Sequence, residues 1–141
     1  MLNKTIVITG ASKGLGSALA ERWCGNNTVI NVSRTSVSSD LKRIVSYQCD
    51  LRCPSQINKT FSQLTKDHPQ IVVLINNAAV LTSSPLAIMN PDKFLEMIDV
   101  NLTAPILISR LIFRQMMSFG GGQIINVLSM ASKLNIIGDA V

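Results

Sequence analysis

Short apolar runs alternate along the chain with segments that have helical periodicity. Five of the runs are nearly continuous and rich in β-branched residues: 5–9, 28–32, 44–49, 71–75 and 124–128. Runs of this kind are typical of strands that are buried on both faces of a parallel sheet. The strand–helix–strand order therefore predicts an α/β fold with a doubly wound, Rossmann-like parallel sheet of five strands and right-handed crossovers.

Three segments between the runs carry helix signals. In the first, five residues follow helical spacing and predict one buried face: Leu15, Ala18, Leu19, Arg22 and Trp23. The second begins at Pro54, which suits the first turn of a helix, and has an apolar face formed by Ile57, Phe61 and Leu64. The third begins at Asn90-Pro91-Asp92, which supplies a cap, a first-turn proline and a favourable acid, and we expect it to run to about Phe119.

The third helix contains a proline that predicts a kink. Pro105 has no N–H, and it lies four residues after Asn101. The carbonyl of Asn101 therefore lacks its usual helical donor and needs water or another donor, and the helix should bend there. A kink that merely fits the core is the alternative.

Composition limits the classes of protein that this sequence can encode. The 141 residues suit one domain (1–141), and 47% hydrophobic against 15% charged residues argue against disorder. Three cysteines and the single His68 argue against a disulfide framework and a zinc site. The net charge of +5 comes from scattered basic residues, so we expect no nucleic-acid partner. No run is long enough for a membrane helix or a signal peptide, so we expect no membrane association and a cytoplasmic location.

A glycine-rich turn follows the first predicted strand. Its sequence is Thr9-Gly10-Ala11-Ser12-Lys13-Gly14-Leu15-Gly16, a Gly-x-x-x-Gly-x-Gly spacing. Such a turn between a buried strand and a helix brings bare backbone N–H groups and the positive end of the helix dipole close to a phosphate. The turn therefore predicts a phosphate-binding site, with a plain tight turn as the alternative.

Further motifs follow in order along the chain. Asn76-Asn77-Ala78-Ala79 ends the fourth predicted strand, Asp50 follows the third, Asn101 lies in the long helix, and Ser129 follows the fifth strand. Together with the glycine turn, these residues resemble the motifs of the short-chain dehydrogenase/reductase family in order and spacing. Two positions depart from the family pattern: Ala79 adds a methyl group where the family usually has glycine, and Leu128 replaces the first of two serines.

The resemblance implies contacts with a nicotinamide dinucleotide. Gly10, Ser12, Lys13, Gly14, Leu15 and Gly16 belong to the cofactor-binding turn. Asp50 accepts a hydrogen bond from the adenine amino group, with the backbone of Leu51 beside it, although a helix N-cap is an equal alternative for Asp50. Asn77, Ala78 and Ala79 lie along the cofactor, near its nicotinamide ribose.

The resemblance also implies roles in structure and catalysis. Asn76 ties strands together. The main-chain carbonyl of Asn101 holds a water of a proton relay. Ser129 hydrogen-bonds the substrate carbonyl and helps to stabilise charge that develops on its oxygen, whereas a strand-end serine that caps a turn is the alternative.

The end of the second predicted strand favours NADPH over NADH. NAD-dependent enzymes carry an acid there, which accepts hydrogen bonds from the adenosine ribose. This sequence has Ser33-Arg34 instead. Arg34 can pair with a 2′-phosphate, and Lys13 can reach the same phosphate. Because position 33 is a serine and not an acid, no negative charge there repels the phosphate. The alternative is that Arg34 and Lys13 are two ordinary surface cations. The missing acid also argues against a domain that binds S-adenosylmethionine.

The family's proton donor is a tyrosine followed four residues later by a lysine. Family spacing places this tyrosine about 13 residues after Ser129, one position beyond Val141. Tyr47 is the only tyrosine of the sequence, and it falls in a predicted strand. We therefore expect a nearly complete cofactor half that lacks the C-terminal strands and most of the substrate pocket.

Three functions remain open. The first is an NADPH-dependent oxidoreductase that acts on a small carbonyl or alcohol substrate and forms a homo-oligomer at full length. The second is a catalytically incomplete NADP-binding module, and the third is an interaction fragment that completes its fold against another chain. We also expect the strand edge at 124–128 and an apolar helix face at Leu107, Leu111 and Met117 to promote self-association.

Overall fold

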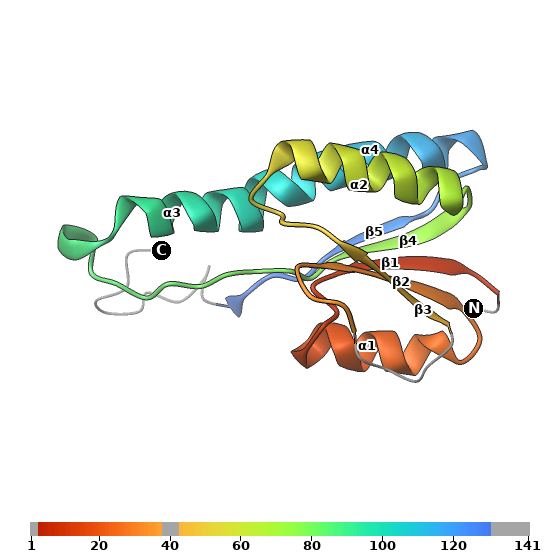
Figure 1. The fold of residues 1–141 in the computed structure, drawn as a ribbon, viewed down its shortest axis with the longest axis horizontal. Coiled ribbons are helices and arrows are strands. Elements are labelled where there is room, and N and C mark those ends of the chain that lie inside the picture. Colours follow the sequence, from red (N-terminus) through yellow and green to blue (C-terminus); the bar gives the residue numbers. More distant parts are fainter. Residues whose placement is uncertain (1–2, 38–42, 131–141) are drawn as a thin grey trace.

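The computed structural model describes residues 3–37 and 43–130. Within these ranges it contains a five-stranded sheet in which all strand pairs are parallel (Figure 1). In chain order the strands are β1 (Thr5–Thr9), β2 (Thr28–Ser33), β3 (Ile44–Gln48), β4 (Ile71–Asn76) and β5 (Gln123–Asn126). All five predicted strands are therefore confirmed, with ends that move by at most two residues.

The strand order β3-β2-β1-β4-β5 places β1 at the centre of the sheet. Ile6 of β1 lies beside Val29 of β2 on one side and Val73 of β4 on the other. The chain moves outward from β1 to β3 and then returns to the opposite side of β1 with β4, so the direction of winding reverses there. In sheets of this kind, ligands bind outside the carboxyl ends of the strands at such a switch point.

Helices cover both faces of the sheet (Figure 1). The helix α1 (Gly14–Cys24) packs on one face, and α2 (Pro54–Asp67) and α4 (Ala104–Ser118) pack side by side on the other. Phe61 of α2 and Ile108 of α4 are buried in the core on this second face. The doubly wound architecture is therefore confirmed.

The predicted buried face of the first helix is wrong. The buried side chains of α1 are small ones: Gly16, Ala20 and Cys24. Three residues of the expected face are exposed: Leu15, Ala18 and Arg22. Leu19 and Trp23 do pack partly against the sheet. At Gly16 the helix lies close to the glycine turn and to Asn77, which directly follows β4, so the buried side of α1 is marked by small residues rather than by large apolar ones.

The helix predicted from residue 90 to about residue 119 is divided into three parts. Asn90 caps α3 (Pro91–Ile98), because its Oδ1 accepts a hydrogen bond from the N–H of Asp92 at 2.9 Å. A π-helical turn, η2 (Asp99–Thr103), joins α3 to α4. It ends just before Pro105, whose missing N–H interrupts regular helical bonding, so the predicted irregularity takes the form of a π-turn. A short 3-10 helix, η1 (Leu86–Ile88), precedes α3 and had no sequence signal.

The outer side of α4 carries exposed apolar side chains. Ile106, Phe113 and Met117 expose 59%, 54% and 66% of their surface. Leu107 and Leu111 differ from the prediction, since they pack partly against the core between the sheet and α2 and α4. β5 forms one edge of the described sheet, as predicted. None of the helices in the described ranges has the length and apolar character that crossing a bilayer requires.

Candidate functional site

A cavity of about 600 Å³ lies at the carboxyl ends of the central strands, where the winding reverses. Most of the predicted cofactor-binding residues line it: Gly10, Ser12, Lys13, Gly14, Ser33, Arg34, Asp50, Leu51, Asn77, Ala78 and Ala79. They come from the ends of β1, β2, β3 and β4 and the turns that follow these strands. The fold therefore brings four separate sequence motifs together around one space.

The turn between β1 and α1 has the backbone that an anion site requires. Gly10 and Gly14 have φ values of +70° and +60°, in the left-handed region that favours glycine. At Gly16, an added Cβ would lie 2.6 Å from both the Nδ2 of Asn77 and the carbonyl oxygen of Gly10. The helix α1 has no side-chain cap and no acid in its first turn. Its first N–H groups and its positive dipole end are thus available to an anion.

A buried asparagine in β2 holds this turn in place. The Oδ1 of Asn31 accepts a hydrogen bond from the N–H of Ala11 at 2.9 Å, and its Nδ2 donates to the Oγ of Ser33 at 2.9 Å. The N–H of Gly10 donates to the carbonyl of Val32, also at 2.9 Å. The turn is therefore fixed to β2 by both backbone and side-chain bonds. Sequence reasoning missed Asn31, because it lies inside an apolar strand.

Thr9 and Asn77 join the ends of β1 and β4. The Oγ1 of Thr9 accepts hydrogen bonds from the N–H groups of Asn77 and Ala78 at 3.0 and 3.1 Å. The Nδ2 of Asn77 donates to the carbonyls of Thr9 and Gly10 at 3.0 and 3.3 Å. The side-chain amide of Asn77 therefore fixes the glycine turn, while the residue also forms part of the cavity wall.

Asn76 ties β4 to its neighbours, as predicted. Its Nδ2 donates hydrogen bonds to the Oγ of Ser109 in α4 at 3.1 Å and to the Oδ1 of Asn126 in β5 at 2.8 Å. Its carbonyl accepts a hydrogen bond from the N–H of Val127 at 2.9 Å. Asn76 is buried and does not line the cavity, so its contribution is structural.

Two cations line the cavity beside the end of β2. Lys13 and Arg34 are both exposed, and neither forms an ion pair with a carboxylate in the part of the chain that the structure describes. Ser33 is buried, and its hydroxyl donates to the carbonyl of Thr35 at 2.5 Å. No acid stands at the end of β2, so the positive charge there is open to an anion.

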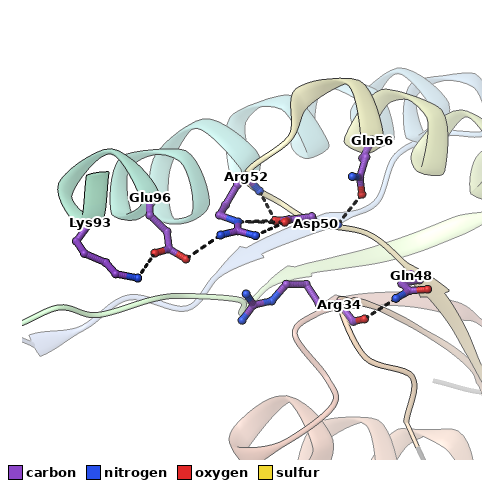
Figure 2. A network of polar contacts seen from close by, with 7 residues as sticks. All are labelled: Arg34, Gln48, Asp50, Arg52, Gln56, Lys93 and Glu96. Carbon is purple, nitrogen blue, oxygen red and sulfur yellow. Dashed lines mark hydrogen bonds and ion pairs between the residues drawn. The ribbon is translucent and has the colours of Figure 1, made fainter. Parts of the chain in front are cut away.

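The carboxylate of Asp50 is bound by Arg52 (Figure 2). The Nε of Arg52 lies 3.0 Å from each carboxylate oxygen, its Nη2 lies 2.5 Å from Oδ2, and its backbone N–H donates to Oδ1 at 3.0 Å. On the other side, the Nη1 of Arg52 lies 3.5 Å from the Oε1 of Glu96, and the Nζ of Lys93 lies 2.9 Å from its Oε2. Alternating charges therefore connect the turn after β3 with α3.

These contacts also decide the alternative role of Asp50. The N-cap position of α2 is taken by Cys53, and no side-chain hydrogen bond caps the helix, so Asp50 is not its N-cap. The hydrogen bond from Arg52 is the main cause that lowers the pKa of Asp50, and the charge of Arg34 adds to it. The pKa of Glu96 is lowered chiefly by its hydrogen bond with Lys93. Both carboxylates are therefore ionised at neutral pH.

Four predicted residues do not belong to the cavity wall: Leu15, Gly16, Asn101 and Ser129. Leu15 and Gly16 lie in the first turn of α1. Asn101 lies in η2, and its side chain is hydrogen-bonded to the backbone of Val80, which does line the cavity. Ser129 is exposed in the segment after β5. Asn101 therefore contacts a residue of the cavity wall but does not line the cavity itself.

The cavity wall also contains seven residues that sequence reasoning missed: Val32, Thr35, Cys49, Arg52, Val80, Glu96 and Val100. Six of them directly precede or follow a predicted site residue along the chain, and this adjacency was a usable signal. Glu96 had no such signal, because only the tertiary fold brings α3 to the cavity.

The parallel sheet, its reversal of winding and the glycine turn at its central strand define a Rossmann-like domain, a class that binds nucleotides at this edge of the sheet. The chain belongs to the short-chain dehydrogenase family, whose family model matches residues 4–141. The family is one of oxidoreductases that use a nicotinamide cofactor. The resemblance seen in the sequence is therefore confirmed.

Relatives of this chain differ in what their names describe. It is 27% identical over 137 residues to an NAD-dependent glycerol dehydrogenase of Listeria innocua, a match that covers 92% of this chain and 54% of that protein. It is 32% identical over 134 residues to an (S)-benzoin-forming benzil reductase of Bacillus subtilis, covering 90% and 55%. The chain spans about half the length of the curated relatives it matches.

Solved structures share the fold. A metagenomic short-chain oxidoreductase, solved in complex with NADP, superimposes with a TM-score of 0.91 at 30% sequence identity. That match covers 99% of this chain and 68% of the other. A short-chain type dehydrogenase/reductase from Mycobacterium marinum gives a TM-score of 0.88 at 26% identity and covers 98% of this chain and 60% of the other.

Proposed function

We propose that this protein is an NADPH-dependent oxidoreductase that transfers hydride between the nicotinamide and a small carbonyl or alcohol substrate. One observation carries the choice of cofactor. Lys13 and Arg34 line the same cavity, next to the uncapped N-terminus of α1, and no acid stands at the end of β2. Two accessible cations suit a ribose that bears a 2′-phosphate, whereas an unphosphorylated ribose is usually held by an acid there.

The residues of the cavity fit a dinucleotide. Its volume of about 600 Å³ is within the range of small-molecule and cofactor sites. Gly14 lines the cavity and has no atom within 4 Å of an added Cβ, so the backbone there is open to a pyrophosphate, and the first N–H groups of α1, which begins at Gly14, have no side-chain cap. In the proposed complex, these N–H groups bind the pyrophosphate, while Lys13 and Arg34 bind the 2′-phosphate.

The two ends of the dinucleotide follow from the strand order. Asp50 and Leu51 follow β3, on the outer side of β2, and they hold the base. Asn77, Ala78 and Ala79 follow β4, on the opposite side of β1, and they hold the nicotinamide ribose. The methyl group of Ala79 calls for a small adjustment of the ribose and leaves binding intact.

The proposed chemistry assigns roles to two further residues. When bound, NADPH supplies the hydride. Ser129 donates a hydrogen bond to the substrate oxygen and stabilises the negative charge that develops there. Asn101 holds a water through its main-chain carbonyl. This carbonyl lacks its usual helical donor, because Pro105, four residues later, has no N–H. Its side chain separately fixes Val80 in the cavity wall.

The cofactor assignment is tested by direct binding of NADPH and NADH, measured by calorimetry. We expect NADPH to bind at least about tenfold more tightly, because a hydrogen bond to a charged group contributes about 1.5–3 kcal/mol. Arg34→Ala and Lys13→Ala should each weaken NADPH binding by about tenfold and leave NADH binding nearly unchanged. Arg22→Ala, which removes an exposed cation of α1 outside the cavity, is the matched control. Tighter binding of NADH would refute the assignment.

A nucleotide-binding module without catalysis is the second candidate, in which Tyr47 has a structural role. Tyr47 lies in β3 outside the cavity wall, and its hydroxyl donates to the Oδ2 of Asp67 at 2.8 Å. Burial and this contact raise its pKa to about 12, which is the wrong direction for a proton donor that must ionise readily. Oxidation of NADPH in the presence of a panel of aldehydes and ketones distinguishes the two candidates. Turnover supports the oxidoreductase, and binding without turnover supports the module.

A further inference from the structure

The strand order fixes where the base of a bound dinucleotide lies. The pyrophosphate belongs at the glycine turn after β1, and the adenosine ribose belongs at the end of β2. The next strand outward is β3. A base attached to this ribose therefore faces the turn after β3, where Asp50 and Arg52 line the cavity.

Arg52 uses most of the hydrogen-bonding capacity of Asp50. A carboxylate has about four lone-pair positions for donors. The Nε of Arg52 reaches both oxygens, its Nη2 reaches Oδ2, and its backbone N–H reaches Oδ1. Asp50 alone would present only acceptors to a base. Bound in this way, it has little acceptor capacity left for the amino group of adenine.

Arg52 in turn keeps donors that Asp50 does not use. A guanidinium carries five N–H groups, of which Asp50 takes two in the geometry observed. The contact between its Nη1 and Glu96 is 3.5 Å long, beyond ordinary hydrogen-bond length. The side chain of Arg52 is 46% exposed and lines the cavity. Glu96 and Asp50 hold the guanidinium from two sides, so its remaining donors have a defined position (Figure 2).

We propose that Arg52 determines base specificity, because the Asp50–Arg52 pair presents the unused donors of Arg52, beside the small acceptor capacity that Asp50 retains, to the edge of the purine. The site then accepts a purine that has a carbonyl oxygen at C6 nearly as well as one that has an amino group. This inference rests on the proposed function, since it concerns the dinucleotide held in the same cavity. It adds a specificity-determining residue that lies next to the predicted site residue Leu51.

The test compares NADPH with its hypoxanthine analogue, which has a carbonyl oxygen in place of the adenine amino group. Dissociation constants are measured by calorimetry, so the readout is independent of turnover. The wild-type protein should bind the two nucleotides within about threefold of each other. Arg52→Met keeps an apolar stem but no donor, and frees Asp50 to accept from the amino group. This variant should favour NADPH by about tenfold, the size of one hydrogen bond to a charged group.

Two further variants separate specificity from general effects. Lys59→Met removes an exposed cation of α2 outside the cavity and should keep the wild-type ratio. Arg52→Lys retains a charged donor and should restore part of the tolerance for the analogue. A wild-type preference of tenfold or more for NADPH, or an unchanged ratio in Arg52→Met, would overturn the inference while leaving the proposed function intact. Failure of folded protein to bind either nucleotide would overturn both.

Discussion

The side-chain amide of Asn101 pairs with the backbone of Val80 through two hydrogen bonds. Its Nδ2 donates to the Val80 carbonyl at 2.8 Å, and its Oδ1 accepts from the Val80 N–H at 2.9 Å. The pair connects η2 with the segment after β4, where Val80 forms part of the cavity wall. The π-turn thus presents a side chain that satisfies the backbone N–H and carbonyl of Val80, and these two bonds attach the segment after β4 to η2.

Replacing Asn101 should release this loop. Asn101→Asp keeps an acceptor for the N–H of Val80 but cannot donate to its carbonyl, and Asn101→Leu loses both bonds. We expect a cost of about 0.5–1.5 kcal/mol for each bond and faster amide exchange at Val80, measured by hydrogen–deuterium exchange. Asn58→Asp, at an exposed position of α2, is the control and should leave this exchange unchanged. Unaltered protection of Val80 in Asn101→Leu would contradict the assigned role.

Gly16→Ala should destabilise the glycine turn. Its new Cβ would lie 2.6 Å from the Nδ2 of Asn77 and from the carbonyl of Gly10, so the helix must move away from the turn. Overpacking of this kind costs about 1–3 kcal/mol, which thermal unfolding detects. Gly25→Ala is the control, because no atom lies within 4 Å of its added Cβ and its φ of −55° suits alanine. That variant should be neutral or slightly stabilising, and equal effects at both sites would refute the argument.

Asn31→Ala should weaken the attachment of the turn to β2. The substitution leaves the buried N–H of Ala11 without its acceptor, at a cost of about 1–3 kcal/mol in the free energy of unfolding. Because Ala11 belongs to the phosphate turn, nucleotide affinity should fall as well. Asn26→Ala changes an exposed asparagine and serves as the control in denaturant unfolding and in binding. A stability equal to that of the control would show that the turn does not depend on Asn31.

Tyr47 should titrate at unusually high pH. Burial and the contact with Asp67 raise its pKa from the ordinary value of 10.0 to about 12. The folded protein therefore holds the phenol proton more tightly than the unfolded chain. This contribution to stability is fully present below pH 10 and is lost as the pH rises through about 12.

The single tyrosine makes the measurement direct. Tyrosinate absorbance should report one transition near pH 12, and Asp67→Asn should move it toward 10. Tyr47→Phe should flatten the loss of stability over the same range. A midpoint near 10 in the folded wild-type protein would contradict the contact between Tyr47 and Asp67.

The sequence predicted the sheet well because strands buried on both faces leave a strong pattern. The ends of β1 to β4 moved by no more than one residue, and Asn90 and Pro91 marked the start of α3 correctly. The face of α1 was predicted wrongly, since a helix that packs closely turns small residues such as Gly16 and Ala20 toward the sheet. Large apolar residues then misidentify the buried side.

The site was predictable where its chemistry is local. The glycine turn, Arg34 and Asn77 each lie at the end of a strand, and the fold collects them in one cavity. The contact between Asp50 and Arg52 could have been predicted, because the two residues carry opposite charges and lie two positions apart. Glu96 could not, because its contact with Arg52 joins elements that are distant in sequence.

The central position of β1 has a consequence for how the chain folds. Its second neighbour, β4, is far along the sequence: the bond from Thr9 to the carbonyl of Ile75 spans 66 positions. A parallel pair cannot form through a tight hairpin, so a long loop must close before β1 gains this neighbour. We therefore expect slow folding. A partly folded intermediate that contains β1, β2 and β3 should be prone to aggregation until β4 and β5 join the sheet.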